Sequence, residues 1–312
     1  MKLGYIRMPD PRPGANGLEA LKGQLNLADD LGYHLGYLPK VDPTHFIKSD
    51  KFSTKNVKVG LDATAFGQLS PGEMEAAVRS VHNALGGKLN LGIEMCCGRK
   101  TTEHRANAQN FETLFSRSFE AMADPKSRFP MREPCPKIIG MPVTGAYTES
   151  ALAAARGYLP LAPSWLTDAQ VARHWPAIVA GATSARRRAR PEHWQLARCI
   201  VVHDSARVIE RYVFGPDSPI RAYYTKLSRR GLIGPDVDAQ LKRIVIAGSS
   251  SQVAERLLAL QEVACEIGTV YVIDPSGRDP EMTKNTMVRL AENVIPMVDS
   301  AQVSATKELE KT

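Results

Sequence analysis

The residues best suited to chemistry form a short, hydroxyl-rich turn between an apolar run at 137–143 and a helix-like segment. Residues 144–148 read Thr-Gly-Ala-Tyr-Thr, and small residues follow as far as Gly157. Thr144 or Thr148 can cap the helix, and Gly157 can close it. The first N–H groups of a helix lack partners within the helix and carry partial positive charge. The turn is therefore a candidate phosphate site, although an ordinary capped helix explains the same residues.

The charge of the chain is basic but unevenly spread. The 312 residues are 43% hydrophobic, which is enough for a sizeable core, and they carry a formal net charge of +7. Positions 186, 187, 188 and 190 are all arginine. Such a run can bind nucleic acid or a membrane surface, but no aromatic residues or binding motif accompany it, so we interpret it as a solvent-exposed loop. We expect neither nucleic acid nor membrane as a partner, whereas a basic surface would attract anionic substrates or a phosphorylated cofactor.

The sequence also favours a cytoplasmic protein. It contains no run of 18 or more apolar residues of the kind that spans a membrane. Arg7 and Pro9 interrupt the beginning of the chain, where a signal peptide would need a continuous apolar core. The cysteines form no C-x-x-C pair, so we expect reduced thiols and no metal site. They lie at positions 96, 97, 135, 199 and 265.

Apolar runs typical of strands alternate with helical segments along the chain, and these elements must position the turn. Leu18, Leu21 and Leu25 have helical spacing, and Pro71 can begin another helix. The predicted strands are Lys2–Met8, His34–Leu38, Val57–Phe66, Lys88–Cys97, Ile138–Val143, Tyr158–Ala162, Trp194–Val202 and Thr269–Ile273. The predicted helices include 101–123 and 168–185, the second capped by Thr167, and a further strand-like run at 244–248 precedes a serine-capped helix.

Eight strands that alternate with helices predict a parallel sheet covered by helices. At about 300 residues, this alternation favours a closed (β/α)8 TIM barrel over an open, doubly wound sheet. We expect residues 1–312 to form this single domain, with a disordered tail from about 299 to 312. The strand carboxyl ends of such a barrel lie at one mouth, where barrel enzymes carry their active sites.

A set of motifs in one order covers about half of the chain. They are AAARGYLPL at 153–161, HW at 174–175, WQLARCIVVHD at 194–204, IAGSSSQVAERL at 246–257 and RLAENVIP at 289–296. Together they resemble the bacterial luciferase-like, flavin-dependent monooxygenases, and the branch with limonene monooxygenase-type enzymes is the most similar. The N-terminal half is similar mainly in its strand–helix rhythm and in its opening MKLGYI.

The resemblance implies a luciferase-like barrel that uses reduced FMN (FMNH2) and O2, with the flavin delivered by a separate reductase. It places the flavin phosphate near the turn after the fifth strand, which the turn's backbone N–H groups and a threonine hydroxyl would bind. An arginine on the helix after the fourth strand could add a cationic contact, and residues at the end of the third strand would lie near the isoalloxazine. The implied cofactor-binding residues are Thr64, Ala65, Arg105, Gly145, Ala146, Tyr147 and Thr148.

Three titratable residues are candidates for acid–base chemistry beside the implied flavin. His45 follows the second strand, where many relatives have a Glu-His pair, Glu94 lies in the fourth strand, and His203 follows the seventh. A histidine there could stabilise or protonate a flavin peroxide, and an inward-facing Glu94 could act as a base. Exposure in a loop or at a strand end explains the same residues without a catalytic role.

The leading hypothesis is a homodimeric, two-component, FMNH2-dependent monooxygenase. It would oxidise a small organic substrate with O2 through a C4a-peroxyflavin. Few charged residues fall at the predicted strand ends, so we expect an apolar or aromatic substrate. One alternative is an oxidoreductase of the same barrel that uses coenzyme F420. Another is a non-catalytic flavin-binding protein on a degenerate barrel, which the missing Glu-His pair motivates.

Overall fold

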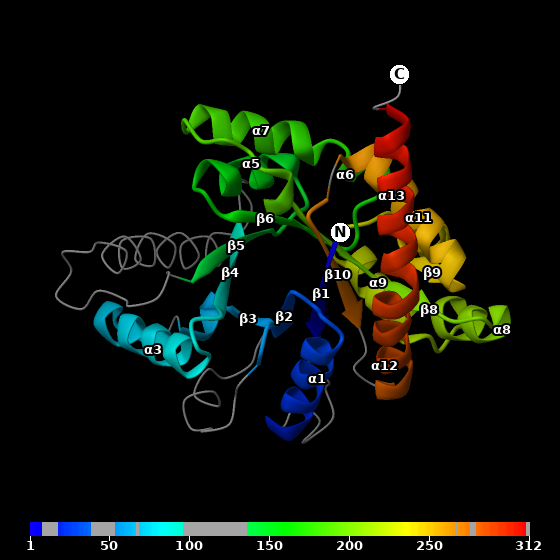
Figure 1. Ribbon diagram of the computed structural model, residues 1–312, viewed down its shortest axis with the longest axis horizontal. Helices are drawn as coiled ribbons and strands as arrows, with labels where there is room; N and C mark the ends of the chain where they lie inside the picture. Colours follow the sequence, from blue (N-terminus) through cyan, green and yellow to red (C-terminus); the bar gives the residue numbers. More distant parts are fainter. Residues whose placement is uncertain are drawn as a thin grey trace.

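Eight parallel strands close into a barrel in the computed structural model of the chain (Figure 1). The structure describes residues 1–7, 18–38, 54–66, 69–95, 136–265, 267–274 and 279–309. The barrel strands are β1 (Lys2–Arg7), β2 (Leu35–Leu38), β3 (Lys58–Asp62), β4 (Leu89–Met95), β5 (Lys137–Pro142), β6 (Leu159–Ala162), β7 (Gln195–Arg198) and β10 (Thr269–Asp274). Their order around the barrel is β1-β10-β7-β6-β5-β4-β3-β2. The predicted (β/α)8 barrel is thus confirmed.

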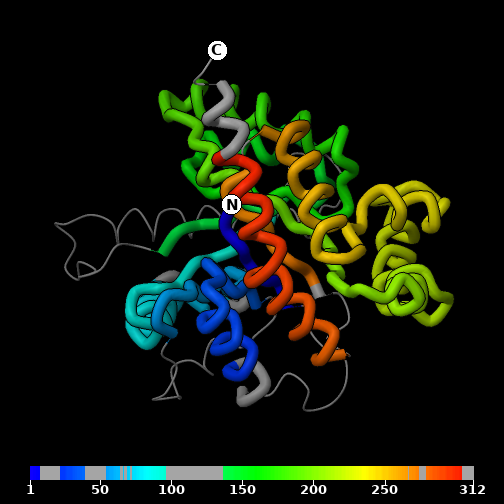
Figure 2. Tube along the Cα trace, turned by 45° about the vertical axis from the view of Figure 1, so that its right-hand side comes forward, coloured from blue at the N-terminus to red at the C-terminus, as the bar shows by residue number. Residues whose placement is uncertain are grey.

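Helices surround this barrel (Figures 1 and 2). They are α1 (Leu18–Asp30), α3 (Pro71–Ala84), α5 (Tyr147–Ala155), α6 (Asp168–Val171), α7 (His174–Ser184), α11 (Ser250–Ala264), α12 (Pro280–Arg289), the π-helix η4 (Leu290–Val294) and α13 (Ile295–Leu309), with short 3-10 turns η1 (Ala63–Phe66) and η2 (Pro191–His193). Figure 2 shows the N-terminus beside α13, where the Met1 amino group forms an ion pair of 3.0 Å with Asp299. Helix α13 runs to Leu309, so it includes most of the tail from about 299 to 312 that we expected to be disordered.

The predicted strand at 194–202 is two strands. It divides at Cys199 into β7 and β8 (Ile200–Val202). Strand β8 leaves the barrel and pairs in parallel with β9 (Ile246–Gly248), which accounts for the strand-like run at 244–248. The insertion between these two strands contains α8 (Ala206–Ile209), the π-helix η3 (Glu210–Phe214), α9 (Pro219–Arg229) and α10 (Val237–Ile244).

The predicted helix at 168–185 is also divided, into α6 and α7. Pro176 has no N–H to donate to the carbonyl of Ala172, so one continuous helix would lack that hydrogen bond. The predicted cap is confirmed, because the Thr167 side chain accepts a hydrogen bond of 3.4 Å from the Gln170 N–H. Because of the break, α7 begins at His174, whose side chain contacts Ser150 of α5.

Gly157 closes helix α5, as predicted, two residues after the last helical residue, Ala155. Gly157 has φ +78°, a conformation that costs glycine little. Its N–H donates to the Ala154 carbonyl at 3.0 Å, and the Tyr158 N–H donates to Ala153 at 2.9 Å. This Schellman arrangement turns the chain directly into β6.

Large aromatic side chains fill the barrel interior because glycines face them. A Cβ atom at Gly92 would lie 2.1 Å from the Tyr37 hydroxyl, and one at Gly60 would lie 2.4 Å from the Tyr37 ring. A Cβ atom at Gly4 would lie 2.5 Å from the ring of Tyr271. Both tyrosines are at most 2% exposed. The two rings therefore close the barrel beneath the mouth where the strands end.

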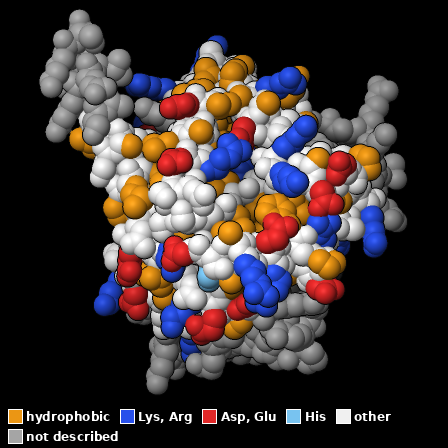
Figure 3. Space-filling view, turned by 90° about the vertical axis from the view of Figure 1, so that its right-hand side faces the viewer, with side chains coloured by type: hydrophobic (Ala, Val, Ile, Leu, Met, Phe, Trp, Pro, Cys, Tyr) orange, Lys and Arg blue, Asp and Glu red, His pale blue; other side chains and the backbone are white. Residues whose placement is uncertain are grey.

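The surface mixes charges of both signs. On the face that carries the insertion helices, acidic and basic side chains are interspersed (Figure 3). The four arginines at 186–190 are exposed, as the sequence predicted for a solvent-exposed loop. Within the described part of the chain, no helix combines the length and apolarity needed to cross a membrane.

Candidate functional site

Two carboxylates face the C-terminal mouth of the barrel, the end at which the strands finish. Asp62 pairs in register with Gly92, and Glu94 pairs with Met141 of the next strand. Because alternate residues of a strand share a face, both carboxylates lie on the inward face that Gly92 shares with the Tyr37 ring. Glu94 is exposed to solvent at the mouth. The prediction that few charged residues occupy these strand ends therefore missed Asp62.

Tyr37 places a buried hydroxyl beneath these carboxylates. Burial first, and then the negative charges of Asp62 and Glu94, raise the pKa of Tyr37 well above its usual value. The hydroxyl is thus protonated at neutral pH, and it has no hydrogen-bond partner among the described residues. It can donate a hydrogen bond to a group bound at the mouth.

The other predicted residues of this mouth lie where the third strand ends. Strand β3 stops at Asp62, earlier than the predicted 57–66, and runs directly into η1. Thr64 and Ala65 belong to η1, so their backbone lies at the carboxyl end of a barrel strand, as predicted. His45 and Arg105 fall outside the described residues.

The turn after β5 is capped differently from the prediction. Helix α5 begins at Tyr147 with Ala146 as its N-cap, and no side chain caps it, so the prediction of Thr144 or Thr148 as the cap was wrong. Instead the carboxylate of Glu149, which is 1% exposed, accepts a hydrogen bond of 3.0 Å from the Thr144 N–H. A carboxylate in the first turn also complements the positive end of the helix dipole.

Gly145 gives the turn its shape. Its φ is +77°, in the left-handed region that side chains other than glycine rarely adopt. A Cβ atom there would lie 2.9 Å from Leu166 and 3.2 Å from the Trp165 indole nitrogen. That indole N–H is buried and has no partner among the described residues. A buried donor therefore lies beside the turn that leads into α5. A bound oxyanion could accept hydrogen bonds from this indole N–H and from the first backbone N–H groups of α5.

His174 fixes this turn from behind, a role that sequence reasoning missed. It is 1% exposed, and its Nδ1 lies 2.8 Å from the Ser150 hydroxyl. The ring also hydrogen-bonds the Gly145 carbonyl. It stacks on Trp194 with ring centroids 5.9 Å apart. The sequence offered only the His-Trp pair at 174–175 as a signal, and that pair gave no information on which residues the ring contacts.

The charge state of His174 follows from its environment. Burial lowers its pKa to about 4, and the hydrogen bond to the Gly145 carbonyl opposes this only in part. The imidazole is therefore neutral at pH 7, where it acts as a hydrogen-bonding support of the turn and adds no positive charge to it.

Replacing His174 with phenylalanine should change how stability depends on pH. The unfolded histidine binds a proton near pH 6.5 and the folded one only near pH 4, so its contribution is complete above pH 6.5 and is lost as pH falls towards 4. The shift corresponds to at most about 3 kcal/mol. We expect the free energy of unfolding of His174→Phe at pH 7 to be about 1–3 kcal/mol lower than that of the wild type, because the Ser150 hydroxyl and the Gly145 carbonyl lose their partner. This difference should be smaller at pH 4.5. Urea unfolding at both pH values measures this; an equal deficit at both would contradict a neutral, buried His174.

The remaining predicted residues differ in placement. Tyr147 (51% exposed) and Thr148 lie at the open start of α5. His203 follows β8 in the two-stranded side sheet, outside the barrel strands. Its Nδ1 accepts a 3.0 Å hydrogen bond from the Ser205 N–H, and the backbone N–H of His203 donates to the Gly248 carbonyl at 2.9 Å. The turn at 144–148 thus lies at the carboxyl end of barrel strand β5, whereas His203 belongs to a different sheet.

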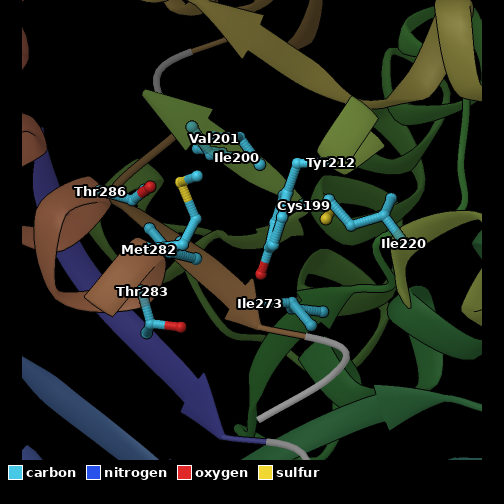
Figure 4. A pocket seen from close by; sticks show the side chains of 10 residues that line it. Cys199, Ile200, Val201, Tyr212, Ile220, Ile273, Met282, Thr283 and Thr286 are labelled. Carbon is cyan, nitrogen blue, oxygen red and sulfur yellow. The ribbon is translucent and has the colours of Figure 1, made fainter. Parts of the chain in front are cut away.

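A small cavity lies at the ends of β7 and β10, under the insertion (Figure 4). Its volume is about 20 Å³. Since one water needs about 10–15 Å³, the cavity can hold a water but not an organic substrate. Figure 4 shows the side chains of Tyr212, Met282 and Thr283 around it. Its lining residues are Cys199, Ile200, Val201, Tyr212, Ile220, Val272, Ile273, Met282, Thr283 and Thr286.

Known structures share this fold at low sequence identity. The oxygenating constituent of 3,6-diketocamphane monooxygenase from the CAM plasmid of Pseudomonas putida, a type II Baeyer-Villiger monooxygenase in complex with FMN, matches with a TM-score of 0.76 and 16% identity over 96% of this chain and 98% of that one. The monooxygenase RslO1 from Streptomyces bottropensis matches with a TM-score of 0.71 and 14% identity over 95% and 99%. The coenzyme F420 dependent tetrahydromethanopterin reductase from Methanopyrus kandleri matches with a TM-score of 0.64 and 13% identity over 95% and 98%.

No family model matches the chain, and no curated protein matches its sequence. The structural likeness shows that the chain shares the fold of these proteins, a closed α/β barrel. It does not single out the limonene monooxygenase branch.

Proposed function

We propose that this chain is a two-component monooxygenase that uses FMNH2 and O2 to oxidise a small apolar or aromatic molecule. The turn after β5 is the observation that carries the proposal. Its left-handed Gly145, the start of α5, which no side chain caps, and the buried indole N–H of Trp165, which has no partner among the described residues, together support a phosphate site.

The residues present fit FMN. The backbone N–H groups of 145, 147 and 148 and the Trp165 indole would hold the phosphate, and His174 would keep the turn in place. The Ala146 N–H would join them by leaving its 3.3 Å hydrogen bond to Thr144 Oγ1. The isoalloxazine would lie over the C-terminal mouth, near the backbone of Thr64 and Ala65. When bound, the reduced flavin would supply the electrons that activate O2. Arg105 remains a predicted further contact with the cofactor.

The protein's own groups would act on protons and on water at the mouth. Glu94 is inward and solvent-accessible, so its carboxylate can accept a proton from a group bound above it. The Tyr37 hydroxyl stays protonated below and can donate a hydrogen bond. Apolar side chains of the inner cluster, such as Ile6, Leu161 and Ile273, would exclude water and favour an apolar substrate. His45 remains a predicted acid–base residue, whereas the side-sheet position of His203 makes Glu94 the stronger candidate.

The same proposal includes the wider properties that the resemblance implies. We propose a single barrel domain for 1–312, a homodimer, a cytoplasmic location, and a separate reductase that delivers the flavin. Similarity to the limonene monooxygenase branch would favour a cyclic, apolar substrate.

A reductase-coupled assay tests the activity. With NADH, FMN and a flavin reductase, the protein should convert members of a panel of cyclic ketones and alkenes to oxygenated products. Glu94→Gln should lower turnover about 100-fold, the usual size of an acid–base contribution, while FMNH2 affinity stays within about twofold. Product analysis by mass spectrometry measures the first quantity and anaerobic titration the second. Oxygen uptake that never exceeds that of the reductase alone would instead favour the non-catalytic flavin-binding alternative.

The F420-dependent alternative rests on the match to an F420 dependent reductase of the same fold. A phosphate-binding turn after β5 would suit either cofactor. Hydride transfer from reduced F420 to a substrate without oxygen uptake would favour this alternative.

A further inference from the structure

Three lysines face the opposite, N-terminal mouth of the barrel. Lys58 pairs in register with Leu35 of the inner cluster, so it faces inward. Lys137 pairs with Asn90, two residues before Gly92, and Lys2 is two residues before Gly4, so they face inward too. These lysines belong to β1, β3 and β5, and alternate strands contribute one layer of a barrel's interior. Such a layer is usually filled by branched apolar side chains, so this one is unusual.

The fourth member of this layer is also polar. Gln195 of β7 pairs with Leu161 of the inner cluster, which makes it an inward residue at the same end. It is 4% exposed, and its Oε1 has no hydrogen-bond partner among the described residues. The whole layer therefore consists of polar side chains.

The charges of the three lysines act on one another and on a neighbouring histidine. Burial and then the charges of Lys137 and Lys2 lower the pKa of Lys58. Burial and then the charges of the same three lysines lower the pKa of His34 to about 4. No carboxylate in the described ranges forms an ion pair with any of the three.

A second histidine extends the basic group. Burial, and then the charge of Lys137, lower the pKa of His193, with smaller effects of Arg190 and Lys2 in the same direction. The charge of Glu192 raises that pKa, so one exposed carboxylate opposes the field from the rim. Lysines still outnumber this carboxylate three to one.

A hollow adjoins this mouth. Its volume is about 300 Å³, and both Lys2 and His34 contribute to its wall. Most of the remaining wall is apolar, including Leu31, Tyr33 and Ile295. The N-terminal mouth thus combines three inward-facing lysines with a neighbouring space large enough for a small organic group.

We propose that the N-terminal mouth of the barrel binds a phosphate-type oxyanion through Lys2, Lys58 and Lys137, with the organic part of a phosphate ester in the adjoining hollow. A doubly charged anion would offset the repulsion among the three ammonium groups and would form charge-assisted hydrogen bonds with them. Strands β1, β3 and β5 begin at this mouth, whereas the turn proposed for the flavin phosphate follows the end of β5. The proposal therefore does not rest on the proposed enzymatic function.

Thermal unfolding at constant ionic strength tests the site, because screening by salt is then the same in every sample. Inorganic phosphate and phenyl phosphate are the probes, with sodium chloride and phenol as their controls. Near 100 times the dissociation constant, a bound ligand should raise the Tm of the wild type by about 5 °C. A response to phenyl phosphate at lower concentration than to phosphate identifies an ester as the ligand, and equal responses identify free phosphate; either supports the site.

Variants show whether the response comes from this mouth. Lys58→Met should remove most of the rise in Tm, and Lys137→Met serves the same purpose if the first variant does not fold. The matched control Lys226→Met removes an exposed lysine of α9 and should keep the response. Gly145→Ala should keep it too, which separates this site from the turn after β5. An equal rise in Lys58→Met or Lys137→Met and wild type, or an equal rise with sodium chloride alone, would overturn the proposal.

Discussion

Replacing Gly145 with alanine should weaken the binding of FMN by about 100-fold or more, equivalent to about 2.7 kcal/mol. The residue has φ +77°, so an alanine there carries about 1–2 kcal/mol of backbone strain. Its Cβ atom would also lie 2.9 Å from Leu166 and 3.2 Å from the Trp165 indole nitrogen. The turn must therefore move, and the donors around the proposed phosphate position move with it.

Gly231→Ala is the matched control for this experiment. Gly231 has φ +68°, but no atom lies within 4 Å of the position of its Cβ. Gly231→Ala thus imposes similar backbone strain without a steric clash. Because the substitution lies outside the turn after β5, the FMN affinity should stay within about twofold of the wild type. Fluorescence titration of FMN measures both variants, with circular dichroism to verify folding. Equal affinities in Gly145→Ala and Gly231→Ala would show that the turn after β5 does not hold the phosphate.

Replacing Gly92 with alanine should destabilise the barrel by about 3 kcal/mol or more. The added Cβ atom would lie 2.1 Å from the hydroxyl oxygen and 2.7 Å from Cζ of Tyr37, inside a closed ring of strands. The Tyr37 ring cannot withdraw easily, because Gly60 on the neighbouring strand also contacts it. Urea unfolding followed by circular dichroism measures the loss.

Two further variants make this result specific. Gly23→Ala in α1 meets no atom within 4 Å and should be stabilising by up to about 1 kcal/mol, since alanine favours a helix. The double variant Gly92→Ala/Tyr37→Ala should lose less stability than the sum of the two single variants, because Tyr37→Ala removes the ring that the new methyl group meets. A Gly92→Ala protein as stable as the wild type would contradict the account of the barrel interior.

The arrangement of the chain in space was predictable where local sequence determines it. Strand-like runs alternating with helices implied the barrel, and Gly157 and Thr167 marked the end of one helix and the start of another. The same local reasoning failed where periodicity alone was ambiguous. Nothing in the apolar pattern of 194–202 showed that Cys199 separates a barrel strand from a strand of the side sheet.

The candidate site was predictable only in part, because its supporting contacts join distant segments. The turn at 144–148 was recognisable from its residue types and from its place after a strand. Ser150 and His174, however, are 24 residues apart, and only the packing of α7 on α5 brings them together. The hydrogen bond from the Thr144 N–H to the Glu149 carboxylate was hidden for a similar reason, since the burial of Glu149 could not be read from the sequence. The basic layer at the other mouth requires the register of separate strands.

The most direct test of the account is an anaerobic binding titration of one protein sample with FMN, FMNH2 and reduced F420. The account predicts that FMNH2 binds with the highest affinity, that Gly145→Ala weakens this binding by about 100-fold or more, and that Gly231→Ala keeps it. Failure to bind either redox form of FMN, or tighter binding of F420 than of FMNH2, would contradict the proposed flavin-dependent monooxygenase.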